Sequence, residues 1–218
     1  MGLIREWREW RDYKRIQEFR ESGMDELLLQ AGLTDAVLTK EQALSIPSVG
    51  TCVDLISDII ATLPIKLHIE SSGKVEEIEK DKRVFLLNDE TLDTLDGYQF
   101  KKALVTDYLL EGAGYAFINR KRNNVESIHY VENRNVSVLV GVDPIFKSYD
   151  ISVNGVNYRE FEFIKIARNS KDGVTGNGII KDHNKILSVA YNTLVFEESL
   201  VKTGGNKKGF LKSLGRLS

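Results

Sequence analysis

Cysteine and histidine are scarce in this chain of 218 residues, and their scarcity excludes a class of site. A single cysteine, Cys52, cannot form an intrachain disulfide or a multi-thiolate zinc site. The three histidines are far apart in the sequence and form no metal-ligand pair. We therefore predict no metal and no other cofactor.

Long apolar runs and an excess of basic charge are also missing. No run reaches the ~18–20 apolar residues that a membrane span requires, and the charged start of the chain does not resemble a secretion signal. The chain has 30 basic and 32 acidic residues, whereas a protein that grips DNA tightly is normally basic. The expected protein is globular, without a membrane partner, and any contact with nucleic acid is expected to be local or indirect.

Recognisable catalytic motifs are absent as well. The loop at 172–178 carries three glycines before a predicted helix, but its order Gly173-x-x-Gly176-x-Gly178 fits neither a phosphate loop nor a dinucleotide loop. No Ser/His/Asp arrangement with a nucleophile motif is present. We predict no catalytic residues, and an unrecognised nucleotide site at this loop is the enzyme alternative.

Apolar periodicity and turn residues instead predict an α+β fold with three main helices and a mixed antiparallel sheet. The first helix should begin near Pro47 and end before Pro64, with Cys52 as a small buried hydrophobe on its apolar face. Asp96 and Gln99 have the spacing of a capping box at the start of the second helix. The expected helices cover 45–63, 96–111 and 179–202.

The strands are predicted from short alternating or apolar runs between turn residues. Asn154-Gly155 is a strong signal for a tight type I′ hairpin. Val84 to Leu87 is a short buried run, and His183 is expected to pack partly buried on the third helix. The expected strands lie at 65–69, 75–78, 115–119, 125–130, 136–142, 149–153, 156–161 and 163–167.

The N-terminal segment is dense in charge, and apolar residues recur in it at every third position. Each step of three falls ~60° short of a full helical turn, so these residues cannot form one narrow face. Two interpretations remain open: a helix wrapped by its own domain, or an arm that docks onto a neighbouring subunit. The aromatic residues of this predicted subunit interface are Trp7, Trp10, Tyr13 and Phe19.

The C-terminal tail is basic, with five basic residues and no acidic one from Ser199 to Ser218. One interpretation is a solvated terminus. The other is contact with an anionic partner, either nucleic acid or an acidic patch on another subunit. The tail residues of this predicted contact are Lys207, Lys208, Lys212 and Arg216.

Several short motifs occur in a fixed order between residues 42 and 217. They are Ala43–Val49 running into Cys52–Ser57 and Ala61–Leu67, then Leu86-Leu87-Asn88, Phe100 with Leu104-Val105, Leu109–Ile118, Asp172–Ile180 and Gly205–Lys212. Together they resemble the phage portal family, in the branch typical of long-tailed phages. The sequence departs from the family pattern at 81–83 and 90–93, which affects the expected loops and leaves the expected fold unchanged.

The resemblance implies a domain organisation. Residues 1–40 would form a helical arm and connector, residues 41–205 a portal wing-like α/β domain, and residues 206–218 a basic tail. That tail would lead into the stem, clip and crown regions of the family, which this sequence lacks.

The resemblance also implies a function. Portal subunits form a homo-oligomeric ring, a dodecamer in the family, at one vertex of the capsid. The ring supports head assembly, lets double-stranded DNA pass during packaging and ejection, and attaches the tail. Implied partners are other copies, capsid, terminase and tail-connector proteins, in the virion and in the host cytoplasm during assembly. A truncated or repurposed portal-like adaptor without a DNA channel is the alternative.

Overall fold

The computed structural model describes residues 37–202, apart from 72, 79, 123, 144, 146 and 147. Thr39–Asn184 form one compact unit, and the described residues from Lys185 onward belong to a second unit. The helices are α2 (Lys40–Leu44), α3 (Pro47–Thr62), α4 (Lys82–Asn88), α5 (Gly97–Leu110), α6 (Ile179–Asp182) and α7 (Asn184–Lys202). The strands are β1 (His68–Ser71), β2 (Lys74–Glu77), β3 (Ala113–Lys121), β4 (Asn124–Val131), β5 (Val136–Val140), β6 (Tyr149–Val153), β7 (Val156–Arg159) and β8 (Phe163–Ala167).

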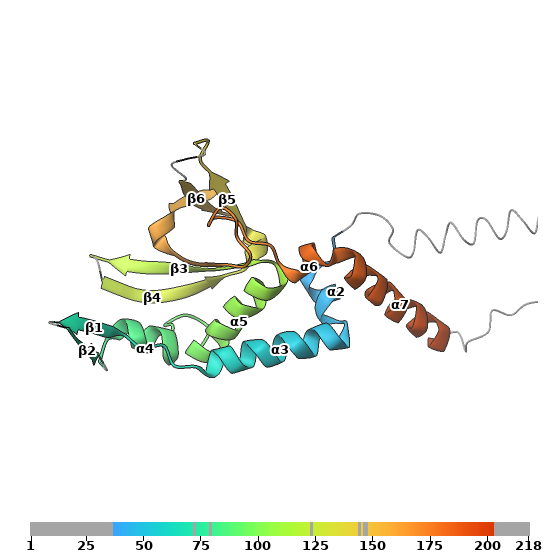
Figure 1. The fold of residues 1–218 in the computed structure, drawn as a ribbon, viewed down its shortest axis with the longest axis horizontal. Coiled ribbons are helices and arrows are strands. Elements are labelled where there is room, and N and C mark those ends of the chain that lie inside the picture. The colour runs from blue at the N-terminus through green and yellow to red at the C-terminus, as the bar shows by residue number, and fades with distance from the viewer. Residues whose placement is uncertain are drawn as a thin grey trace, which may run out of the picture. The chain divides into compact units, whose positions relative to one another are not determined.

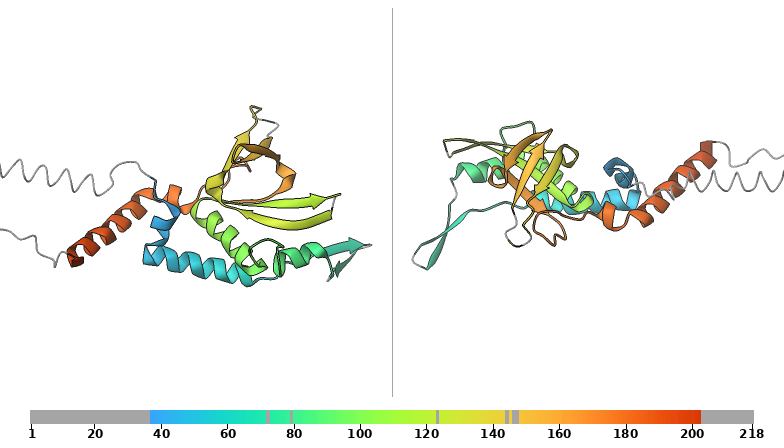
Figure 2. Two further views of the ribbon diagram at one scale, coloured as in Figure 1. Left: turned by 180° about the vertical axis from the view of Figure 1, so that it is seen from behind. Right: turned by 90° about the horizontal axis from the view of Figure 1, so that it is seen from above.

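The compact unit is built in layers, which Figure 1 shows stacked from bottom to top. α3 packs against α5, and α5 packs against a three-stranded antiparallel sheet of order β4-β3-β8. The second antiparallel sheet, of order β5-β6-β7, covers the other face of the first sheet. The β1–β2 hairpin extends away from these layers, and all its described residues are exposed (Figure 2).

Strand β3 contributes to two hydrophobic cores, because successive side chains of a strand point to opposite faces. On one face, Ala116 packs with residues of α4, α5 and β4, namely Leu86, Phe100, Leu104 and Ile128. On the other face, Tyr115 and Phe117 pack toward the second sheet. There the rings of Phe117, Tyr158 and Phe163 contact one another edge to face, with centroids 5.3–5.7 Å apart. Burial raises the pKa of Tyr115 to about 12.

A buried charge joins α2, α5 and β4. Asp107 lies on α5, and its carboxylate is about 1% exposed. It accepts hydrogen bonds from the Lys40 ammonium group of α2 and, at 2.6 Å, from the Tyr130 hydroxyl of β4. Burial and the bond to Asp107 raise the pKa of Tyr130, so the phenol stays protonated and keeps donating. Burial, reinforced by the nearby Asp107 charge, also raises the pKa of Glu111.

The main helices and the strand order confirm the α+β prediction. α3 begins at Pro47 and ends at Thr62, and the Asp96 carboxylate caps α5 by accepting the Gln99 N–H at 2.7 Å. In the β6–β7 hairpin, Asn154 and Gly155 have φ values of 50° and 85°, as a type I′ turn requires. The predicted single sheet is divided into two three-stranded sheets and a separate hairpin.

Several local predictions are wrong. The strand expected from Ile65 begins at His68, because the Asn88 side chain pairs with the backbone N–H and C=O of Ile65, both at 2.8 Å. The third helix is interrupted at His183, which leaves the helical conformation, is exposed and separates α6 from α7. Cys52 is exposed, because α3 turns its small residues toward α5.

Two further segments are more regular than expected. The junction between the predicted connector and the predicted wing-like domain forms α2, which starts with a capping box between Thr39 and Gln42. The run from Val84 to Leu87 lies in α4, where Leu86 is fully buried and Phe85 is exposed. The domain predicted at 41–205 stays a prediction, since its C-terminal end lies outside the described residues.

The buried charge yields a stability prediction. Lys40→Met leaves the Asp107 carboxylate in the interior with one hydrogen-bond donor fewer, so we expect the free energy of unfolding to fall by about 2–3 kcal/mol. Urea denaturation at pH 7 measures this change. The matched control is Lys66→Met, which removes an exposed ion pair with Glu77 and should leave the midpoint nearly unchanged. Equal effects of the two substitutions would contradict the structural role of Asp107.

Candidate functional site

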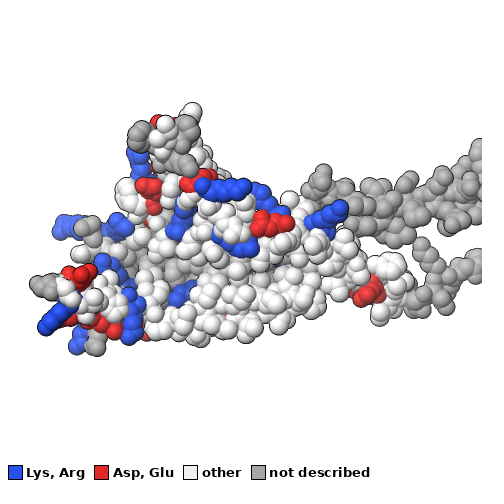
Figure 3. All heavy atoms as spheres, viewed as in Figure 1, with Lys and Arg blue, Asp and Glu red and all other residues white. Residues whose placement is uncertain are grey.

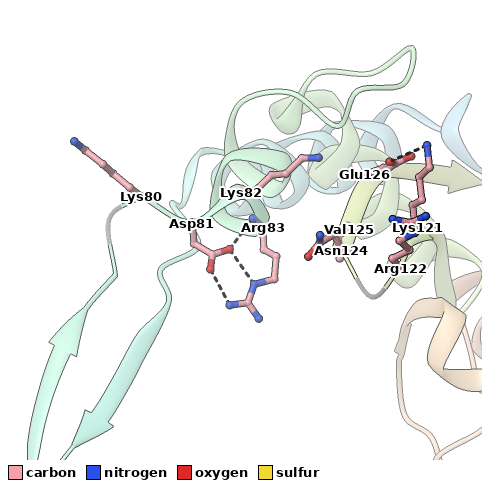
Figure 4. Close-up of a pocket in the computed structure, with 9 residues that line it drawn as sticks. All are labelled: Lys80, Asp81, Lys82, Arg83, Lys121, Arg122, Asn124, Val125 and Glu126. Carbon is pink, nitrogen blue, oxygen red and sulfur yellow. Dashed lines mark hydrogen bonds and ion pairs between the residues drawn. The ribbon is translucent and has the colours of Figure 1, made fainter.

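A basic cleft lies between the start of α4 and the tip of the β3–β4 hairpin (Figure 4). Its volume is about 690 Å³. The two sides come from segments some forty residues apart, which the packing of α4 on β4 holds together. The lining residues are Lys80, Asp81, Lys82, Arg83, Lys121, Arg122, Asn124, Val125 and Glu126.

Local bonds neutralise part of this charge. Asp81 caps α4 by accepting the Arg83 N–H at 2.8 Å, and the Arg83 guanidinium grips the same carboxylate with two further bonds of 2.8 and 2.9 Å. These side-chain and backbone bonds lower the pKa of Asp81 to about 2. On the opposite wall, formed by the β3–β4 hairpin, the Lys121 ammonium group lies 4.0 Å from a carboxylate oxygen of Glu126.

Three cations of the cleft form no ion pair with a described acid. They are Lys80, Lys82 and Arg122, all exposed. Figure 3 shows blue side chains, with red ones among them, at the end of the compact unit that carries the β1–β2 and β3–β4 hairpins. The arrangement can hold an extended anion by charge. Its walls are mainly solvated side chains, so it lacks the apolar enclosure of a small-molecule site.

The glycine-bearing loop has a packing role. A Cβ atom on Gly176 would lie 1.8 Å from the Gly112 carbonyl oxygen, and one on Gly178 would lie 2.1 Å from that of Leu110. Gly112 itself has a φ of 96°. The loop backbone therefore lies directly against the end of α5, where a side chain would not fit, and the space that a phosphate would need beside these glycines is filled.

Asp172 explains how the loop keeps this shape. Its carboxylate accepts the N–H groups of Val174 and Thr175, each at 2.8 Å, and the hydroxyls of Thr175 and Ser170. These bonds lower the pKa of Asp172, and the bond from the Thr175 N–H has the largest effect. The carboxylate is thus engaged within its own turn.

The residues predicted as sites at the two ends of the chain lie outside the described residues. They are Trp7, Trp10, Tyr13 and Phe19 in the arm, and Lys207, Lys208, Lys212 and Arg216 in the tail. Both surfaces stay predictions. The sequence analysis missed the basic cleft, although two dense basic runs, 80–83 and 120–122, could have indicated it. Among the described residues, no cluster of histidine, cysteine or acidic side chains could hold a metal, and no helix is long and apolar enough to cross a membrane.

Solved structures similar to this chain include a phage portal protein and the necks of gene transfer agent particles. An HK97-family phage portal protein from Corynebacterium diphtheriae matches with a TM-score of 0.54 and 14% identity, over 84% of this chain and 57% of that chain. The neck of an empty gene transfer agent particle, computed with C6 symmetry, matches with a TM-score of 0.59 and 16% identity, over 80% and 48%.

A third match is the neck of a native gene transfer agent particle, computed with C12 symmetry. Its TM-score is 0.52 and its identity 16%, over 76% of this chain and 47% of that chain. This chain therefore spans about half the length of the solved chains it matches. No curated protein matches the sequence at a significant level.

The layered α+β fold of this chain is the one found in these portal and neck chains. The family model described as phage portal protein matches residues 47–218, which is most of the chain. The chain belongs to the phage portal protein family.

The structure gives a physical reason for several residues that carried the resemblance. Asn88 ties α4 to the segment after α3 through two bonds to the backbone of Ile65. Gly112, Gly176 and Gly178 bring the end of α5 and the loop before α6 into backbone contact. These positions fix how separate segments meet.

The cleft yields a binding prediction. Lys82→Glu with Arg122→Glu should weaken binding to a short DNA duplex, and the slope of log affinity against log salt should fall by about two. Fluorescence anisotropy over a salt series measures both quantities. The control, Lys171→Glu with Lys181→Glu, makes the same charge change at exposed residues that do not line the cleft. Equal losses in the two double variants would indicate only a general charge effect.

The glycine contact yields a second prediction. Gly176→Ala places a methyl group against the Gly112 carbonyl, and we expect it to lower the free energy of unfolding by about 3 kcal/mol or more. Gly73→Ala is the control, because no atom lies within 4 Å and only the left-handed backbone costs about 1 kcal/mol. Thermal unfolding followed by circular dichroism compares them. A Gly176→Ala protein as stable as the control would contradict the close contact.

Proposed function

We propose that this protein is a structural subunit of a portal ring at one vertex of a phage capsid. The family match over residues 47–218 carries the proposal. The layered fold shared with an HK97-family portal and with gene transfer agent necks supports it. Those necks were computed with C6 and C12 symmetry, which supports a ring of several copies.

In this role the ring would support head assembly, let double-stranded DNA pass during packaging and ejection, and attach the tail. Its partners would be further copies of the chain together with capsid, terminase and tail-connector proteins. The protein would be present in the virion, and in the host cytoplasm during assembly. It would not be an enzyme, since the family is structural.

The charge of the chain supports passage of DNA without tight binding. Its 30 basic and 32 acidic residues nearly balance, so the protein as a whole has no strong attraction for a polyanion. The basic cleft would give a local contact that salt weakens. Such a contact would hold DNA briefly and release it.

Particle composition tests the proposed function. We expect quantitative mass spectrometry of purified particles to give about twelve copies per particle, as the C12 neck suggests. Gold-labelled antibodies against the purified chain should mark a single vertex. The same label should be found on empty heads that carry no tail, because a portal enters at the start of head assembly. A label found only on particles that have completed packaging would favour the adaptor alternative, and hundreds of copies per particle would contradict both.

A further inference from the structure

Helix α3 has an unusual distribution of side chains. The residues that face α5 are small or medium-sized, namely Val53, Ser57 and Ala61, and all three are buried. The face away from α5 is aliphatic and exposed, and we call it the α3 stripe. It consists of Cys52, Leu55, Ile56, Ile59, Ile60 and Leu63, and the exposed fractions of its five large side chains are 60%, 42%, 55%, 41% and 57% in chain order.

These residues form one continuous surface. At ~100° per residue, the six positions fall within about 140° of the helix circumference, with Cys52 near the middle. Figure 3 shows the lower edge of the compact unit, along α3, as almost entirely uncharged. A contiguous row of Leu and Ile side chains is rarely left in water, and such patches mark interaction surfaces.

Side-chain bonds tie α3 to α5 beside the α3 stripe. The Lys102 ammonium group of α5 bridges Asp54 at 3.3 Å and Asp58 at 2.6 Å, on the flank of α3 next to the stripe. The Tyr98 hydroxyl donates to Asp58 at 2.7 Å. Lys101 reaches the Leu63 carbonyl at 3.0 Å and fixes the end of the helix. A partner would therefore meet a surface that is already ordered, and binding would cost little conformational entropy.

We propose that the α3 stripe is a subunit interface, and that a second copy of this chain covers it. The inference rests on the proposed function, because a ring supplies a neighbouring copy at every position. The chemistry of the α3 stripe also fits a permanent contact between subunits. The stripe contains only aliphatic side chains and one thiol, as in obligate interfaces, which resemble a protein core divided in two.

The charges beside the α3 stripe leave room for the same occupant. A ring with more than two copies uses heterologous contacts, in which two different surfaces of the subunit meet. Beside the stripe, the acids Asp54 and Asp58 are matched by the bases Lys101 and Lys102, so the flank has no net charge that would repel a neighbouring copy.

Cys52 offers a direct test, because it is the single cysteine of the chain and lies within the stripe. The purified chain is assayed over a concentration series by sedimentation velocity and by the rate of maleimide labelling. We expect the chain to assemble as its concentration rises. The rate of maleimide labelling of Cys52 should be at least about tenfold lower in the assembled form. Protection that is independent of concentration, in a monomer, would mean that the chain covers its own stripe and would overturn the proposal.

Two double variants complete the test. Leu55→Ser with Ile59→Ser should abolish assembly and restore the labelling rate, while the melting temperature stays within a few degrees because both side chains are mostly exposed. Val75→Ser with Val156→Ser changes equally exposed side chains outside the stripe and should leave assembly intact.

The outcomes separate this proposal from the proposed function. In one outcome, particles carry the protein at one vertex, but Cys52 stays reactive in the assembled form or the stripe variant still assembles. This outcome would overturn the interface and leave the portal function standing. A chain that stays monomeric with a reactive Cys52 at every concentration would overturn the second copy as the occupant.

Discussion

The buried carboxylate of Asp107 is the interaction on which the layered unit depends. It accepts hydrogen bonds from Lys40 and Tyr130, so that α2, α5 and β4 meet at one negative charge. An unpaired charge in a protein interior costs several kcal/mol, so these three segments must form together or leave the carboxylate exposed. This requirement fixes the position of α2 at the start of α3.

Backbone contacts give the unit a second rigid point. Gly112 ends α5 with a left-handed turn, and the loop containing Gly176 and Gly178 lies against it without intervening side chains. The Arg168 N–H donates to the Gly112 carbonyl at 2.8 Å, which joins the end of β8 to the same place. A glycine-rich loop before a helix can bind phosphate, but here the glycines serve close packing.

The two faces of α3 show how one helix can serve both fold and assembly. Small residues allow close approach to α5, whereas the larger aliphatic residues are left on the outer face. In a protein that functions alone, this distribution would be a liability for solubility. In a ring subunit, the outer face becomes interior when the neighbouring copy binds. The basic cleft is separate from this surface and remains open to a polyanion.

The sequence by itself determined the local elements. The proline that starts α3, the Asp96 cap of α5 and the Asn154-Gly155 turn act through neighbouring residues, so local rules predicted them correctly. The order of short motifs was also enough to indicate the family. The tertiary structure alone decided which side of each element is buried. Cys52 was predicted as buried because α3 is apolar, but the direction of burial depends on α5, which is distant in sequence.

The same reason explains the remaining differences. The late start of β1 and the division of the strands into two sheets both follow from contacts between remote segments. The basic cleft joins two runs that are each unremarkable alone, and only the packing of α4 on β4 brings them together. Periodicity along the chain determines secondary structure and overall amphipathicity, whereas the pairing of faces depends on distances in space that no local pattern contains.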